Sequence, residues 1–219
     1  MKLLIDAFPD GGIIPDRYAF GKPDPETHVT FSENRNPGLH WSDPPAGTRS
    51  FVLICHDSDA PSIGNDVNRE GRSVSRDLPR ASFFHWVVID IPAGVRGIAE
   101  GVDSDRVTPR GKASVSGERG RTGRNDYTGW FTGDSQLEGV YHGYDGPGPP
   151  WNDERVHNYI FTVYALDVDH LELDLPESTG AESDGGFGGE DVLRALGDHV
   201  LGRAEWSGRY TLNPALREG

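Results

Sequence analysis

The stretch GYDGPGPPWNDERVHNYIFTVYALD, residues 143–167, joins a glycine- and proline-rich loop to a segment that is typical of a β-strand. Residues 143–150 disfavour a helix or a central strand, because proline lacks the N–H that both need for their backbone hydrogen bonds. From Val156 the chain is rich in β-branched and aromatic residues, which favour a strand. Side chains alternate along a strand, so His157 and Tyr159 are predicted to share one face.

This arrangement leaves two interpretations open. A loop that proline already orders loses little entropy when a ligand arrives, which favours a preformed binding site beside His157. The same residues are also typical of an ordinary loop before a core strand, with His157 hydrogen-bonded and purely structural.

The composition narrows the class of protein. The chain has 219 residues, which predicts a single domain over residues 1–219. With 29 Gly, 16 Pro and 35% hydrophobic residues, it favours short strands and ordered turns over long helices. The net charge of −14 argues against nucleic acid and anionic membranes as partners.

Residues 1–10 contain an early acidic residue and no apolar core of a signal peptide, so we expect a cytoplasmic protein without stable membrane insertion. The single cysteine, Cys55, excludes an internal disulfide and a cysteine metal cluster, and its apolar neighbours indicate burial. No metal or nucleotide signature is intact, so no cofactor is expected.

Alternation and turn chemistry predict short strands separated by loops. A polar loop is expected over 62–80, an acidic linker over 177–189, and a helix over 189–205, where Val192, Leu196 and Val200 recur at helical spacing. The expected strands cover residues 1–5, 27–31, 39–41, 50–56, 83–92, 170–175 and 206–212.

Two polar signals accompany the central strands. Asp57 and Asp59 directly follow the apolar run 50–56, and an extended segment would point both carboxylates the same way. They are interpreted equally well as part of a site or as caps of a tight turn. His85 lies in the apolar run 83–92, where Phe83, His85, Val87 and Ile89 are expected on one face and Phe84, Trp86 and Val88 on the other.

The order of these motifs resembles the phosphatidylethanolamine-binding protein family, and more narrowly its bacterial and archaeal Raf-kinase-inhibitor-like branch. The motifs are DSDAP at 57–61, HWVVIDIP at 85–92, GYDGPGPP at 143–150 and HNY at 157–159. The segments FPDGGIIP at 8–15, LHW at 39–41 and NDYTGWF at 125–131 also look like that branch. Each motif alone is weak, but four in the same order are specific.

The resemblance implies an all-β fold of two antiparallel sheets with Greek-key connections and a few short helices, including one near the C-terminus. It implies a binding or regulatory protein with a pocket for phosphate or the phosphoryl group of a larger ligand, and it suggests a homodimer. Two departures are Ser58 where the family usually has Pro, and Gly148 where the branch often has Cys. Carried over by matching motif, the pocket residues are Asp57, Asp59, Pro61, His85, Gly146, Pro149, His157 and Tyr159.

In this hypothesis His85 and His157 donate hydrogen bonds to the anion, and Tyr159 adds a hydroxyl donor. At least one of Asp57 and Asp59 accepts a bond from a histidine and favours its charged form, so affinity is expected to fall as the pH rises above neutrality. The alternative is a metal-dependent hydrolase or transferase that uses Asp57, Asp59 and the two histidines. A third interpretation is a protein-binding module that uses the surface around Trp130 and Trp151.

Overall fold

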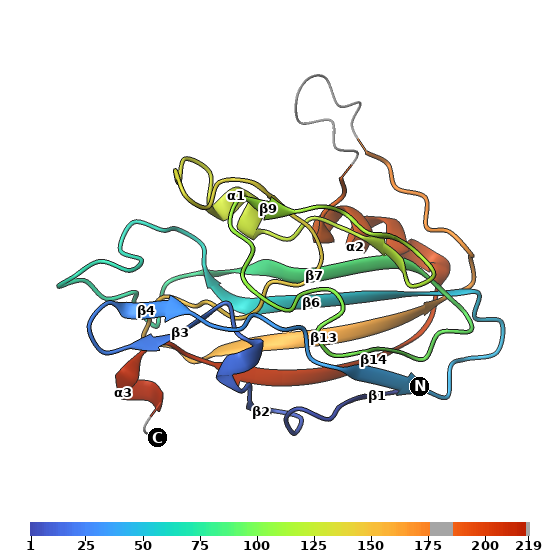
Figure 1. The fold of residues 1–219 in the computed structure, drawn as a ribbon. Coiled ribbons are helices and arrows are strands. Elements are labelled where there is room, and N and C mark those ends of the chain that lie inside the picture. Colours follow the sequence, from blue (N-terminus) through green and yellow to red (C-terminus); the bar gives the residue numbers. More distant parts are fainter. Residues whose placement is uncertain (176–185, 218–219) are drawn as a thin grey trace.

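The computed structural model describes residues 1–175 and 186–217 and is built mainly of β-strands (Figure 1). A seven-stranded sheet forms its centre, in the order β10-β11-β7-β6-β13-β14-β2. Neighbouring strands are antiparallel except β14 and β2, which are parallel. The strands of this sheet are β2 (Gly12–Ile13), β6 (Ser50–Pro61), β7 (Arg80–Pro92), β10 (Ser116–Gly117), β11 (Gly120–Thr122), β13 (His157–Leu166) and β14 (Val200–Tyr210).

Three smaller sheets surround the large one. β1 (Lys2–Ile5), β5 (Leu39–Ser42) and β8 (Gly97–Ile98) form an antiparallel sheet in the order β1-β5-β8. β3 (Gly21–Asp24) pairs with β4 (His28–Phe31), and β9 (Gly111–Lys112) pairs with β12 (Val140–Tyr141). The short helices are α1 (Tyr127–Trp130), α2 (Gly189–Leu196) and α3 (Pro214–Arg217), with 3-10 turns at Asp16–Tyr18 and Gly197–His199. The mostly-β class with few helices, one of them near the C-terminus, is confirmed.

Both faces of the large sheet are covered, which explains why β6 is apolar at every position from Phe51 to Cys55. Leu53 belongs to the hydrophobic cluster that includes Trp41 of the three-stranded sheet. The next residue, Ile54, belongs to the cluster that includes Val192 of α2. Each such side chain contributes about 1.5–3 kcal/mol when fully buried, so the sheet is fixed from both sides.

The predicted helix over 189–205 is wrong after Leu196. Gly197 adopts a φ of +41°, a conformation that suits glycine, and ends the helix. Val200–Tyr210 then pairs with β13 along its whole length, so the helical spacing of Val200 and Ala204 is coincidental. Tertiary pairing has overridden the local pattern.

Other boundaries also differ from the predictions. Residues 170–175 form no strand, and the Leu171 N–H donates instead to the Asp90 carboxylate at 2.8 Å. β6 and β7 extend further than expected, through Asp57–Pro61 and from Arg80, and these extensions lead to the site described below. Residues 177–185 of the predicted linker lie outside the described residues. None of the described helices is long and apolar enough to cross a membrane.

Candidate functional site

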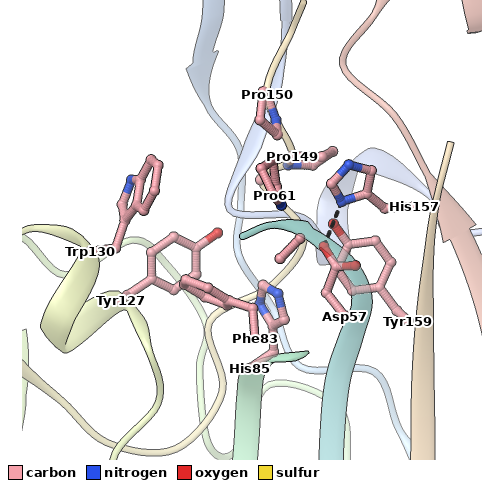
Figure 2. A pocket seen from close by; sticks show the side chains of 12 residues that line it. Asp57, Pro61, Phe83, His85, Tyr127, Trp130, Pro149, Pro150, His157 and Tyr159 are labelled. Atoms are coloured by element: carbon pink, nitrogen blue, oxygen red, sulfur yellow. Dashed lines mark hydrogen bonds and ion pairs between the residues drawn. The ribbon is translucent and has the colours of Figure 1, made fainter. Parts of the chain in front are cut away.

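A cavity of about 110 Å³ lies where β6, β7 and β13 meet α1 and the loop 143–150 (Figure 2). Its volume suits a group of a few heavy atoms, since one water occupies about 30 Å³ of liquid. Trp130 at its rim is half exposed, so the cavity opens to solvent. The lining residues are Asp57, Ala60, Pro61, Phe83, His85, Tyr127, Trp130, Gly148, Pro149, Pro150, His157 and Tyr159.

The structure brings together six of the eight residues predicted for the pocket, from three segments far apart in the chain. Asp59 and Gly146 lie beside the cavity and do not line it. The six are Asp57, Pro61, His85, Pro149, His157 and Tyr159.

Asp57 and Asp59 have different surroundings, although one residue separates them. Oδ1 of Asp57 accepts the Asp59 N–H at 2.7 Å, as in a local turn. Oδ2 of Asp59 accepts the backbone N–H and the side-chain amide of Asn158 at 3.0 and 2.8 Å. Burial by itself raises the pKa of Asp59, but these hydrogen bonds outweigh it and leave the pKa below its ordinary value. Asp57 therefore lines the cavity, whereas Asp59 lies outside it and binds Asn158.

His157 is held between two carboxylates, and one of them, Asp57, is among the two aspartates predicted to accept a hydrogen bond from a histidine. Its Nδ1 bonds to Oδ2 of Asp57 at 2.7 Å, and its Nε2 bonds to Oδ2 of Asp153 at 3.0 Å. Burial lowers the pKa of His157, but the two carboxylates outweigh burial and raise it to about 9. A carboxylate can only accept, so both ring nitrogens carry protons.

Asp153 also holds a second cation. Arg80 at the start of β7 donates to Asp153 through Nη1 at 2.5 Å and through Nη2 at 3.0 Å. Asp57, His157, Asp153 and Arg80 thus form a buried row of alternating charges with no net charge. The predicted donation from His157 to an anion is wrong, because both of its nitrogens are already occupied.

His85 is the extra residue of a β-bulge. Cys55 pairs with Trp86, and the next residue, His56, pairs with Phe84, so His85 has no partner on β6. A bulge redirects side chains near it. The expected shared face of Phe84, Trp86 and Val88 is therefore wrong for Phe84, which packs toward α2, while Trp86 and Val88 share the opposite cluster.

A reciprocal backbone contact fixes the ring of His85. Its Nδ1 lies 2.7 Å from the Asp145 carbonyl oxygen, and the Asp145 N–H donates to the His85 carbonyl at 3.0 Å. A carbonyl only accepts, so the proton is on Nδ1. Burial lowers the pKa of His85 to about 4, and the nearby Asp57 charge offsets this only in part. His85 is therefore neutral near pH 7, and no hydrogen bond between described residues uses its Nε2.

Two further groups in the wall are unpaired donors. The Tyr159 hydroxyl is buried close to the Asp57 carboxylate, but no group meets it at hydrogen-bond distance and angle. Burial, and then the nearby Asp57 charge, raise the pKa of Tyr159 well above its ordinary value, so the hydroxyl keeps its proton. The backbone N–H of Gly148 also takes part in no hydrogen bond of the described structure.

The rigidity predicted for the loop 143–150 comes largely from a buried network. The Asp145 carboxylate accepts from Asn34 Nδ2 at 2.6 Å and from Asn125 Nδ2 at 2.8 Å, and lies 3.0 Å from the Lys112 ammonium. The Gly146 N–H donates to Asn34 Oδ1 at 2.8 Å. Gly146 thus positions the loop, while Gly148, Pro149 and Pro150 line the cavity.

The sequence interpretation missed six lining residues. Tyr127 and Trp130 belong to the segment 125–131, which the sequence indicated as a motif of the family, and Figure 2 shows both facing the cavity from α1. A Cβ on Gly148 would lie 2.5 Å from the Tyr127 hydroxyl oxygen, so a larger residue would require Tyr127 to move. The missed residues are Ala60, Phe83, Tyr127, Trp130, Gly148 and Pro150.

The geometry does not assemble a metal site from the predicted ligands. Both ring nitrogens of His157 already take part in hydrogen bonds, one of them to Asp153, and the Asp153 carboxylate also accepts from Arg80. Within residues 1–175 and 186–217, no group of three or more His, Cys, Asp or Glu side chains is arranged to hold a metal ion.

Comparison with known proteins gives consistent matches. The family profile described as "Phosphatidylethanolamine-binding protein" matches residues 5–211. The UPF0098 protein YbhB of Escherichia coli K12 is 31% identical over 175 residues, which cover 80% of this chain and 83% of YbhB. A UPF0098 protein of Methanothermobacter thermautotrophicus is 32% identical over 210 residues, which cover 96% of this chain and 98% of that protein.

Two solved structures share the architecture. One is a putative phosphatidylethanolamine-binding protein homologue, CT736 from Chlamydia trachomatis, with a TM-score of 0.57, 25% identity and 95% coverage of both chains. The other is E. coli YbcL, described as a new member of the mammalian PEBP family, with a TM-score of 0.59, 23% identity and coverage of 96% of this chain and 97% of YbcL. The second match shows the fold alone.

Proposed function

Because the chain belongs to the phosphatidylethanolamine-binding protein family, we propose that its cavity binds a small oxyanion or the phosphoryl group of a larger ligand. The protein acts in this proposal by binding and regulation. The proposal extends the family assignment to a ligand class, and the geometry of the cavity supports it.

The observation that carries the proposal is the set of unpaired polar groups in one small cavity. The Tyr159 hydroxyl is a buried donor without a hydrogen-bond partner, which costs about 1–3 kcal/mol, and the N–H of the exposed Gly148 takes part in no hydrogen bond of the described structure. A ligand with oxygen acceptors satisfies both. Since His157 balances Asp57, the nearest carboxylate does not leave a net negative charge at the site.

The geometry favours binding over catalysis. The Asp57 carboxylate is already bonded to the Asp59 N–H and to His157, so neither oxygen is poised as a free nucleophile. Cys55 faces the hydrophobic core, and burial raises the pKa of its thiol well above the ordinary value. The alternative of a metal-dependent enzyme finds no support in this arrangement.

Titration with inorganic phosphate and methyl phosphate, followed by calorimetry or by amide NMR shifts, tests the proposal. Substitution of His85→Ala is expected to weaken binding by about 1–3 kcal/mol, the cost of one lost hydrogen bond in a buried site. His199→Ala is the matched control, because His199 is half exposed and pairs with Asp167. No binding at tens of millimolar phosphate, or equal affinities of the wild type and His85→Ala, would contradict the proposal.

Cytoplasmic location, the homodimer and any protein partner stay predictions. Sedimentation of the purified chain tests the predicted dimer, and a monomer at micromolar concentration would contradict that prediction.

A further inference from the structure

The cavity wall contains a neutral hydrogen-bond acceptor, Nε2 of His85, in addition to the Asp57 carboxylate. Nδ1 of His85 donates to the Asp145 carbonyl at 2.7 Å, so the lone pair of the neutral ring is on Nε2. His85 lines the cavity, and its Nε2 has no partner among the residues that the structure describes. A ligand that fills the cavity therefore meets an acceptor as well as donors.

Aromatic rings keep His85 in this neutral state. Its ring centroid lies 5.0 Å from that of Phe83, 5.6 Å from that of Tyr127 and 5.2 Å from that of Tyr159. This enclosure removes water from the imidazole and disfavours its charged form.

Charged groups from the neighbouring strands act on His85 in opposite directions. Asp57 on β6 favours protonation of the ring, while His56 on β6 and His157 on β13 disfavour it. Burial dominates, and the pKa of His85 falls to about 4. Nε2 is therefore an acceptor at any pH above about 5.

A fully ionised oxyanion does not match this wall. Its oxygens can accept from the Tyr159 hydroxyl, but they have no proton for His85 and would face its lone pair. A buried acceptor without a donor costs about 1–3 kcal/mol.

We propose that the cavity selects a singly protonated oxyacid, such as the monoanion of a phosphomonoester, and that the ligand's own proton bonds to Nε2 of His85. This inference rests on the proposed function and adds the protonation state of the ligand to it. His85 is then the residue that distinguishes a phosphomonoester from a sulfate ester or a phosphodiester, which are anions of similar shape without that proton.

Methyl phosphate and methyl sulfate provide the direct test, because at pH 5.5 both are mainly monoanions and they differ by one proton. The wild-type protein is expected to bind methyl phosphate about tenfold more tightly than methyl sulfate, the value of one hydrogen bond to a buried acceptor. Above the second pKa of the phosphomonoester, which is about 6, its affinity is expected to fall about tenfold per pH unit. The affinity for methyl sulfate stays constant.

The variant His85→Gln separates the histidine from simple charge repulsion. An amide can turn its N–H₂ toward an ionised ligand, so the preference for methyl phosphate over methyl sulfate is expected to fall close to one. A tenfold preference that survives in His85→Gln would assign the selection to another group and overturn the inference. His199→Gln, at an exposed position, is the control and is expected to keep the wild-type ratio.

The wild-type protein also tests the inference without a variant. In ¹⁵N-histidine spectra at pH 5.5, methyl phosphate is expected to shift the Nε2 signal of His85 while the Nδ1 proton stays in place. Binding of both esters with equal affinity, or tighter binding of the dianion, overturns the inference and leaves the proposed function standing. Failure of both esters to bind at any pH overturns the proposed function, and the inference with it.

Discussion

His85 and His157 line the same cavity but have opposite electrostatic surroundings. His157 lies between the carboxylates of Asp57 and Asp153, and its pKa rises to about 9. His85 faces a backbone carbonyl and three aromatic rings, and its pKa falls to about 4. Near pH 7 His157 is therefore a cation and His85 a neutral ring.

The difference separates a structural histidine from one that a ligand can reach. Both ring nitrogens of His157 donate hydrogen bonds within the row of charges that joins β6, β13 and Arg80. His85 lines the cavity and leaves its Nε2 available to a ligand. The expected fall of affinity above neutrality rested on a histidine whose charged form Asp57 or Asp59 favours. It needs a different cause, because neither His85 nor His157 changes charge between pH 5.5 and 8. The protonation of the ligand supplies that cause in our proposal.

The largest effect is expected from breaking the row of charges at Asp153. The substitution Asp153→Ala leaves Arg80 and His157 buried without their shared partner, and it is expected to lower the free energy of unfolding by about 3–5 kcal/mol. Denaturant unfolding measures this change. Asp169→Ala is the control, because the exposed pair of Asp169 and Arg49 is worth at most about 1 kcal/mol. Equal stability of the two variants would show that His157 is not held as described.

The second prediction concerns alkaline pH. The pKa of His157 is raised in the folded state from 6.5 to about 9, so its contribution to stability is complete below pH 6.5 and is lost as the pH rises through 9. Between those two values the wild type is expected to lose about 2.5 kcal/mol more than His157→Gln. Denaturant unfolding at a series of pH values provides the test, and parallel curves for the two proteins would contradict it.

The third prediction has the opposite sign and concerns His85. Its pKa is lowered in the folded state from 6.5 to about 4, so the neutral ring contributes fully above pH 6.5 and its contribution is lost as the pH falls toward 4. From pH 6.5 to pH 5 the wild type is expected to lose about 1.5 kcal/mol more than His85→Gln. A ¹⁵N-histidine titration gives the same information directly, and a His85 midpoint near 6.5 would sink this assignment.

The smallest effect is expected at Asp59, which the sequence placed in the pocket and the structure places beside it. Asp59→Asn keeps most of the contacts to Asn158, so phosphate affinity is expected to change by less than about twofold. Calorimetric titration with phosphate measures it. A larger loss of affinity would show that Asp59 contributes to the binding site.

Much of the fold could be predicted from local patterns. The alternation of His157 and Tyr159 and the apolar run of β6 are confirmed, because strand periodicity and burial on both faces leave clear traces in sequence. The helix after Leu196 was misjudged because its apolar spacing also suits a strand paired on β13. The bulge at His85 could not be predicted, because a bulge depends on the register of the partner strand.

The sequence by itself determined the family and the mostly-β class, because ordered motifs and side-chain periodicity are properties of the chain. The convergence of Asp57, His85 and His157 on one cavity was implied by the resemblance to that family. Only the tertiary structure decided which histidine is charged, which nitrogen stays free and which aspartate faces the cavity. These properties depend on desolvation and on hydrogen-bond partners such as Asp153, Arg80 and the Asp145 carbonyl, which folding brings together from distant segments.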